Sequence, residues 1–287
     1  MASSARGSTP ERMPSLAEPP AIPALAAYFD GLYAALASSS VFARIGRETF
    51  GDAFVGQLGC AGEAEFFRLA ELAGAAPGRT ILDLYSGSGG LTTWLSARTG
   101  ASLVGVDCSA LGLRLGRIAA GGEVAAVRGD VDALPFRGSS VDGVVSLDGF
   151  SYRTDRLAAE CLRVIRPSGT LAMLISLPEA AVVAETGCLA DAGFRDAWAE
   201  DCTAAAIALT TRWLASFRRH AREHVLDVGE RYHRGITGEL EALLRGYESG
   251  QLRRVFIVAR GGSRPGDAAR GPSSNGFPTD RGSGARI

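Results

Sequence analysis

The sequence contains no lysine, so all 30 of its Lys and Arg residues are arginines. This absence excludes chemistry that depends on a lysine amine, such as a Schiff base or the phosphate-binding lysine of a P-loop. Charge is scarce as well, with 21% charged residues, a net charge of −1 and a pI of about 6.3. Nucleic-acid-binding proteins usually carry a basic excess, so we expect no nucleic-acid partner.

Long apolar runs and paired cysteines are also missing. No run approaches the roughly 20 residues that a membrane helix needs, and the first residues lack the apolar segment of a signal peptide. We therefore expect a cytoplasmic protein with no membrane partner. The cysteines stand singly, without metal or redox spacing, and we expect them to be small buried residues and the chain to hold no metal; they are Cys60, Cys108, Cys161, Cys188 and Cys202.

The most informative stretch is 80–91, which reads T-I-L-D-L-Y-S-G-S-G-G-L. Its first five residues are mostly apolar, as in a buried parallel strand, and they are interrupted by Asp83. Three glycines follow, and then a helical period begins. A strand, a glycine turn and a helix together let the backbone approach a ligand at the carboxyl edge of a parallel sheet.

The following chain alternates between apolar strands and helical segments, which predicts an α/β fold with a doubly wound, mostly parallel sheet. The pattern breaks at 203, where a long helical segment precedes the final strand. We expect seven strands, at 81–84, 103–107, 124–127, 141–147, 170–177, 195–200 and 252–259.

Composition and periodicity divide the chain further. An aromatic stripe at 23–37 has helical spacing, and it indicates either a helix packed on the core or a lid over a pocket. The expected units are a disordered tail at 1–22, a helical N-terminal segment at 23–76, a core at 77–202, a helical cap at 203–250, the final strand at 251–260 and a disordered tail at 261–287.

Polar residues end successive strands of the predicted sheet. Asp107 closes the second strand, about 20 residues after the glycine turn, where a carboxylate can bind both hydroxyls of a ribose. Asp130 follows the third strand, and Ser146 and Asp148 close the fourth. Any one of them alone is explained by a turn or a helix cap. A nicotinamide dehydrogenase would carry G-x-G-x-x-G, which the glycines here do not match.

These residues carry a resemblance to the class I S-adenosylmethionine-dependent methyltransferases, particularly those that act on small molecules. The similar stretches run in the family's order over about 80–177. They are I-L-D-L-Y-S-G-S-G-G at 81–90, V-G-V-D-C-S at 104–109, G-D-V-D-A-L-P-F at 129–136, V-D-G-V-V-S at 141–146 and L-R-V-I-R-P-S-G at 162–169.

The resemblance implies a Rossmann-like fold and S-adenosylmethionine as cofactor. This sequence departs from the family pattern at Tyr85, where the family usually has glycine. A tyrosine there would crowd the amino-acid end of the cofactor. The cofactor-binding residues that it implies, together with Gln57 from a covering segment near Tyr33, are Asp83, Tyr85, Gly87, Gly89, Asp107, Cys108, Asp130, Val131 and Ser146.

The candidates for a general base are less specific. His220 and His224 are four residues apart on a predicted helix at 210–225, and they indicate a solvated face, a base or a metal site. Tyr152 and Asp148, after the fourth strand, are the other candidates.

We therefore expect a methyltransferase that acts on a small molecule, such as an intermediate of bacterial secondary metabolism, at N, O or C. Two alternatives stay open: a non-methylating cyclase or lyase, and a non-catalytic partner subunit. A homodimer is also open.

Overall fold

The computed structural model describes residues 22–119, 121, 125–149 and 155–262. Their strands form one seven-stranded sheet in the order β3-β2-β1-β4-β5-β7-β6. All pairs from β3 to β5 are parallel, and β7 is antiparallel to both β5 and β6. The predicted mostly parallel, seven-stranded sheet is confirmed. The strands are β1 (Thr80–Leu84), β2 (Ser102–Asp107), β3 (Ala125–Arg128), β4 (Val141–Leu147), β5 (Ile165–Pro178), β6 (Arg195–Asp201) and β7 (Leu252–Arg260).

Helices cover both faces of this sheet because the central strands are apolar on both sides. In β1, Ile81 packs into the cluster formed with α3 and α4, whereas Leu82 and Leu84 pack into the opposite cluster, with α6 and α7. The helices of these layers are α3 (Glu63–Leu72), α4 (Gly90–Thr99), α5 (Ala110–Ala119), α6 (Asp155–Val164) and α7 (Glu179–Asp191).

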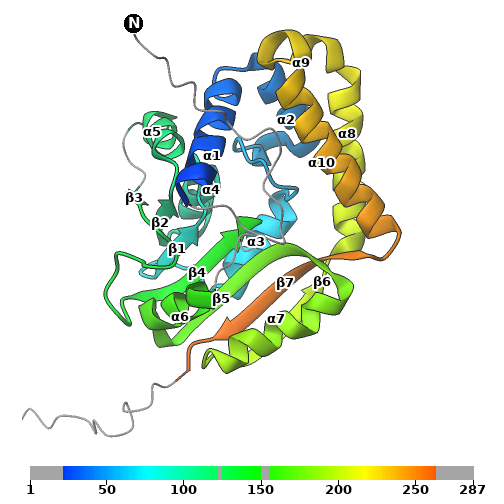
Figure 1. The fold of residues 1–287 in the computed structure, drawn as a ribbon. Coiled ribbons are helices and arrows are strands. Elements are labelled where there is room, and N and C mark those ends of the chain that lie inside the picture. Colours follow the sequence, from blue (N-terminus) through cyan, green and yellow to red (C-terminus); the bar gives the residue numbers. More distant parts are fainter. Residues whose placement is uncertain (1–21, 120, 122–124, 150–154, 263–287) are drawn as a thin grey trace, which may run out of the picture.

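A third apolar cluster lies outside the sheet, between the N-terminal helices and the helical insertion. It includes Leu32, Phe42, Trp213 and Phe217. Figure 1 shows these helices gathered on one side of the sheet, with the sheet's own helices α6 and α7 away from them. The cluster is built from α1 (Ile22–Leu36), α2 (Ser40–Phe50), α8 (Thr203–Arg219), α9 (Ala221–Val228) and α10 (Glu230–Glu248), and we call α8–α10 the cap.

Helix α2 falls within the helical N-terminal segment expected at 23–76, and Ser39 begins it by accepting a hydrogen bond from the Phe42 amide (2.9 Å). Local structure differs from the sequence prediction in two places. The predicted continuous helix at 210–225 is wrong, because α8 ends at Arg219 and His220 separates it from α9. Strand β5 begins at Ile165, earlier than the expected start at 170, and a bulge takes up the irregular pairing with β4.

Most of the two predicted tails lies outside the described residues. Among the helices that the structure describes, none combines the length and the apolar character that a membrane span requires.

Candidate functional site

The glycine turn after β1 is a tightly constrained loop. Gly87 and Gly89 have φ values of 55° and 70°, a region that favours glycine. The Gly87 amide donates a hydrogen bond to Asp107 Oδ2 (2.8 Å). At Gly90, a Cβ atom would lie 2.0 Å from the carbonyl oxygen of Val55. The turn is therefore held between the end of β2 and the loop that follows α2.

Asp107 lies at the carboxyl end of β2 with both carboxylate oxygens bonded to backbone. Oδ2 accepts from Gly87 and Oδ1 from the Ser109 amide (2.7 Å), and the residue is 8% exposed. Burial raises the pKa of its carboxyl, and the two amide hydrogen bonds oppose that shift. The neighbouring Cys108 is half-buried, and burial together with the Asp107 charge raises the pKa of its thiol to about 11. The carboxylate is therefore fixed in direction beside the glycine turn.

Helix α1 is docked over this edge. Asp30 accepts hydrogen bonds from the Ser109 hydroxyl and from the Leu111 amide (3.1 Å), so that it satisfies the amino-terminal end of α5. One turn later, the Tyr33 hydroxyl lies against Gly87, where a Cβ atom would be 2.1 Å away. Burial and the charge of Asp107 raise the pKa of Tyr33. The aromatic stripe thus packs into the apolar cluster, and Tyr33 of the same helix lies against the turn.

An open, mostly apolar groove of about 680 Å³ flanks the turn, between α1 and α2 on one side and α4 and α5 on the other. Tyr33, Ser88 and Gly90 belong both to its walls and to the turn region. Helix α1 therefore borders the turn and the groove together.

Asp83 is an acidic residue inside β1. It is 1% exposed and accepts a hydrogen bond from the Thr92 hydroxyl of α4 (2.6 Å). Burial raises the pKa of this carboxyl to about 7, and the charge of Asp107 adds to the shift. Because this pKa lies near neutral, a charged ligand placed nearby would change the protonation state of Asp83.

Tyr85 has an uncommon backbone conformation for a bulky residue, with φ 59°. Its ring lies over Gly149, where a Cβ atom would be 2.0 Å from Tyr85 Cδ2, and it packs against the apolar cluster on the α6 side. The positive φ is a conformation that glycine adopts more readily than tyrosine.

Ser146, near the end of β4, is 1% exposed, and its hydroxyl has no hydrogen-bond partner among the described residues. Buried polar groups normally have a partner, so this hydroxyl is one of a few exceptions in the described part of the chain. Asp130 follows β3 and accepts from the Asp132 amide (2.8 Å), which is the contact of a turn residue. Val131 packs beside it on the apolar cluster.

Gln57 is engaged within its own loop. Its side-chain oxygen accepts from the Val55 amide (2.8 Å), and its nitrogen donates to the carbonyls of Ala53 and Ala61 (3.2 Å each). Both amide hydrogens are thus used, and the contacts observed for Gln57 brace the loop at 53–61.

Asp148 is paired with a residue that the sequence did not single out. Arg254 of β7 is 2% exposed, and its guanidinium contacts both carboxylate oxygens of Asp148, with Nη2 3.0 Å from Oδ2. It also donates to the Ser176 hydroxyl (3.1 Å) and to the Cys60 carbonyl (3.3 Å). Tyr247 of the cap is hydrogen-bonded to Ser176. This network joins the end of β4 to the final strand and to the cap.

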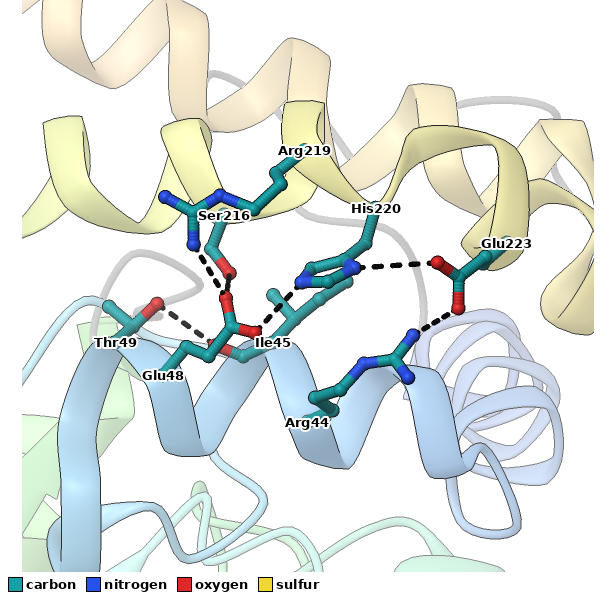
Figure 2. A network of polar contacts seen from close by, with 8 residues as sticks. All are labelled: Arg44, Ile45, Glu48, Thr49, Ser216, Arg219, His220 and Glu223. Atoms are coloured by element: carbon teal, nitrogen blue, oxygen red, sulfur yellow. Dashed lines mark hydrogen bonds and ion pairs between the residues drawn. The ribbon is translucent and has the colours of Figure 1, made fainter.

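His220 lies in a polar network between α2 and the cap (Figure 2). Its Nε2 is 2.8 Å from Glu48 Oε1, and its Nδ1 is 3.7 Å from Glu223 Oε1. Ser216 and Arg219 also bond to Glu48 (2.8 and 3.0 Å). Both ring nitrogens face carboxylates of this network, so the observed contacts of His220 hold two helices together.

His224 is fully buried, so the prediction of a solvated face is wrong for this residue. Its Nδ1 is 3.1 Å from Nδ1 of His233, and its ring packs edge-on against Phe217 (centroids 5.1 Å apart) and close to Phe42. Burial, with the nearby His233, lowers the pKa of His224 to about 4, which makes it a weak base near neutral pH. Its surroundings are those of an aromatic core residue.

Two candidates from the sequence remain, a metal site and Tyr152. In the described part of the chain, no three His, Cys, Asp or Glu residues gather in a way that could hold a metal ion. Tyr152 lies outside the described residues.

Comparison with known proteins finds relatives for part of the chain. Residues 81–169 match a family model described as a methyltransferase domain. A ubiquinone/menaquinone biosynthesis C-methyltransferase, UbiE of Acidiphilium cryptum, is 40% identical over 102 residues, which cover 32% of this chain and 40% of that protein. Residues 81–169 are therefore similar to a methyltransferase domain, and the seven-stranded sheet agrees with that similarity. The chain spans about 40% of the length of the curated relatives that it matches first.

Two solved structures share the fold over most of this chain. Phosphoethanolamine N-methyltransferase 2 of Haemonchus contortus, in complex with S-adenosyl-L-methionine, has a TM-score of 0.66 and 17% identity, covering 82% of this chain and 60% of that one. The [4+2]-cyclase SpnF has a TM-score of 0.69 and 14% identity, covering 88% and 100%. At these identities the likeness shows the fold.

Two residues around this region, Asp30 and Arg254, were not predicted from the sequence. Each had a faint signal: Asp30 interrupts the aromatic stripe one turn before Tyr33, and Arg254 is a charged residue within an otherwise apolar strand. Both partners lie far away in the sequence, at Ser109 and Asp148. Only the folded chain brings them together.

Proposed function

We propose that this chain is an S-adenosylmethionine-dependent methyltransferase that acts on a small molecule. The observation that carries the proposal is Asp107. It is a buried carboxylate at the end of the second strand, oriented by the Gly87 and Ser109 amides beside the glycine turn of a methyltransferase domain. That placement suits a carboxylate that binds the two hydroxyls of a ribose.

The residues present fit the cofactor. One feature is independent of the family: the buried Ser146 hydroxyl, which has no hydrogen-bond partner among the described residues. We assign Asp107 to the ribose and Ser146 to the methionine portion. The other residues that we assign to the cofactor are Asp83, Tyr85, Gly87, Gly89, Cys108, Asp130, Val131 and, from the covering loop, Gln57.

The bound cofactor would supply a methyl group that the sulfonium charge already makes reactive. The protein then has to align the acceptor, exclude water and, for a hydroxyl or ammonium acceptor, remove a proton. Helix α1, through Tyr33 and Asp30, closes the edge over the turn. Asp148 and Tyr152, after β4, remain the acceptor-side candidates. His220 and His224 are weaker ones, since the cap network and the aromatic core already account for their contacts.

Several wider assignments rest on the sequence alone. A role in bacterial secondary metabolism, a cytoplasmic location, the absence of a nucleic-acid partner and a choice between monomer and homodimer are part of this proposal. The second candidate function is a non-methylating reaction such as cyclisation, which the likeness to SpnF favours at the level of the fold.

Calorimetric titration with S-adenosylmethionine and with S-adenosylhomocysteine tests the proposal. We expect micromolar binding of both. Absence of binding by either compound would contradict the cofactor assignment and favour a partner subunit. With binding established, formation of S-adenosylhomocysteine on incubation with acceptor mixtures supports methyl transfer. A converted substrate without that product supports the second candidate.

A further inference from the structure

We propose that the groove between α1, α2, α4 and α5 is an additional ligand site, separate from the cofactor site. Its ligand is an aliphatic carboxylate, with the charged group at Arg98 and the hydrocarbon chain along α4. The inference goes beyond the proposed function, since binding at this site requires no methyl transfer.

The groove is distinct from the residues that we assign to the cofactor and the acceptor. Within the described part of the chain, no residue assigned to the cofactor lines its walls, and neither Asp148 nor either candidate histidine does. Ser88 and Gly90 bring one side of the glycine turn to its wall. Its volume of about 680 Å³ lies in the range typical of pockets that enclose small molecules. The groove therefore has room for a ligand of its own.

The walls of the groove are mostly apolar. Leu36 and Phe42 line it from α1 and α2, and Trp94 and Leu115 line it from α4 and α5. Ile118 also lines it and is 69% exposed, so the apolar surface continues to the open side. Covering such a surface with hydrocarbon is favourable in proportion to the apolar area removed from water. The groove therefore favours a ligand with a hydrocarbon body.

The shape of the groove follows helix α4. One face of α4 runs along it, with the lining residues at helical spacing: Gly90, Thr93, Trp94, Ala97 and Arg98. With a rise of about 1.5 Å per residue, Gly90 and Arg98 lie about 12 Å apart along the helix axis. At the Gly90 end, α5 packs on the turn so closely that a Cβ atom at Gly116 would lie 2.1 Å from the Ser88 carbonyl oxygen. This shape suits an extended chain that runs along α4.

The charge of the groove comes from Arg98, which is the one charged residue among the described residues that line it. Its guanidinium carbon lies 4.8 Å from the centroid of the Trp94 ring, so it rests against the groove wall. The side chain is 44% exposed, and it is paired at 3.4 Å with Glu63, whose side chain is 58% exposed. An exposed pair of this kind contributes little to stability. A ligand carboxylate can therefore replace Glu63 at Arg98, whereas an ammonium group would meet a like charge.

The test titrates octanoate, 1-octanol and octylammonium into the full chain, with calorimetry and ligand-observed NMR as the readouts. We expect octanoate to bind at least fivefold more tightly than the alcohol and at least tenfold more tightly than octylammonium. Butyrate keeps the carboxylate and lacks four of the methylenes. It should bind at least tenfold more weakly than octanoate, because each methylene buried against the apolar walls adds to affinity.

Two substitutions test the charged end in opposite directions. Arg98→Gln should remove the preference for octanoate over 1-octanol. Glu63→Gln should raise the affinity for octanoate at least twofold, because it removes the competing carboxylate, and a misfolded protein would show no such gain. Arg218→Gln, which breaks an exposed pair with Glu241 on the cap, is the matched control and should change neither quantity.

A third substitution tests the location of the chain. Ala97→Phe places a ring in the groove from an exposed position of α4, and it should weaken octanoate binding at least tenfold. Ala184→Phe, at an exposed position of α7 outside the groove, should leave it unchanged. Saturation with S-adenosylhomocysteine should change the affinity for octanoate less than twofold, because the two sites are separate.

Tighter binding of octylammonium than of octanoate, or equal affinities for octanoate and butyrate, would overturn the inference. Displacement of octanoate by S-adenosylhomocysteine would also overturn it, because the groove would then belong to the cofactor site. Absence of octanoate binding would overturn it as well, and a change in molar mass of Ala97→Phe by light scattering would then show that a second copy of this chain covers the groove. Binding of S-adenosylhomocysteine to the unaltered protein tests the proposed function separately.

Discussion

The hydroxyl of Tyr33 lies against Gly87 so closely that a Cβ atom at position 87 would come within 2.1 Å of it. Gly87→Ala must therefore displace Tyr33 and also adopt a φ of 55° with a side chain. We expect the dissociation constant for S-adenosylhomocysteine to rise at least tenfold, and the free energy of unfolding to fall by about 1–2 kcal/mol. Calorimetry and urea unfolding measure the two effects.

The matched control for that substitution is Gly187→Ala in α7, where no atom lies within 4 Å of the added Cβ. It should leave ligand affinity unchanged and raise stability slightly, because alanine is the better helix former. Equal ligand affinities for the two variants would contradict the role assigned to the turn.

Asp107→Asn keeps the shape of the side chain and removes its charge. The backbone amides of Gly87 and Ser109 both point at the carboxylate, so one of them will face an amide nitrogen. We expect S-adenosylhomocysteine to bind about 10- to 100-fold more weakly, which is about 1.5–3 kcal/mol for a hydrogen bond to a charged group. Asp196→Asn, at an exposed position, is the control. An unchanged dissociation constant would exclude the ribose assignment.

Asp83 should make stability depend on pH. Its pKa is raised from 3.8 to about 7, so the unfolded chain releases this proton at a lower pH than the folded chain does. Stability therefore falls as pH rises from about 4 to about 7, and the loss is complete above that range. Asp83→Asn should be more stable than the unaltered protein at pH 8, by at least about 1 kcal/mol, and nearly equal to it at pH 4.

Urea unfolding of both forms at the two pH values measures this difference. A constant difference in stability would show that the carboxyl is not desolvated as described. We expect Asp83→Asn to weaken cofactor binding even where it stabilises the fold, because functional sites retain groups that cost stability.

The buried His224 should make the protein sensitive to acid. The pKa of His224 is lowered from 6.5 to about 4, so protonation favours the unfolded chain as pH falls below about 6.5. At pH 5 this residue should cost on the order of 2 kcal/mol relative to pH 7.5. His224→Phe retains the aromatic packing against Phe217 and should remove that loss, whereas His220→Gln should retain it. Equal losses in His224→Phe and the unaltered protein would contradict the buried, neutral state.

The sheet could be predicted from the sequence because its signals are local. Parallel strands buried on both faces appear as short apolar runs, and glycine turns and helix caps mark where they end. The exceptions show the limit of that approach. The segment at 166–169 carries Pro and Gly and suggests a turn, yet it lies within β5 as a bulge between the paired residues Ile165 and Thr170. The pairing on either side of the segment decides where the strand begins, and that pairing is not visible in the local sequence.

The residues around the turn were predictable only where each of them ends or follows a strand of the repeat. Gly87 and Asp107 come from the strand ends of adjacent units, and their positions follow from the repeat. The pairs Asp148–Arg254 and Asp30–Ser109 join residues 106 and 79 positions apart. No local pattern encodes such a pair, because each partner alone looks like an ordinary charged or capping residue. The prediction that His220 and His224 lie on one continuous helix was wrong for a related reason. Helix α8 ends before His220, and α9 begins after it.

Helix α1 has a consequence for the timing of turnover. The bond from Ser109 to Asp30 and the contact between Tyr33 and Gly87 lie one turn apart on this helix, so they form and break together. A ligand bound at the turn beneath Tyr33 would be covered by α1 on that side. We expect a change that loosens α1 from the start of α5 to speed the exchange of such a ligand.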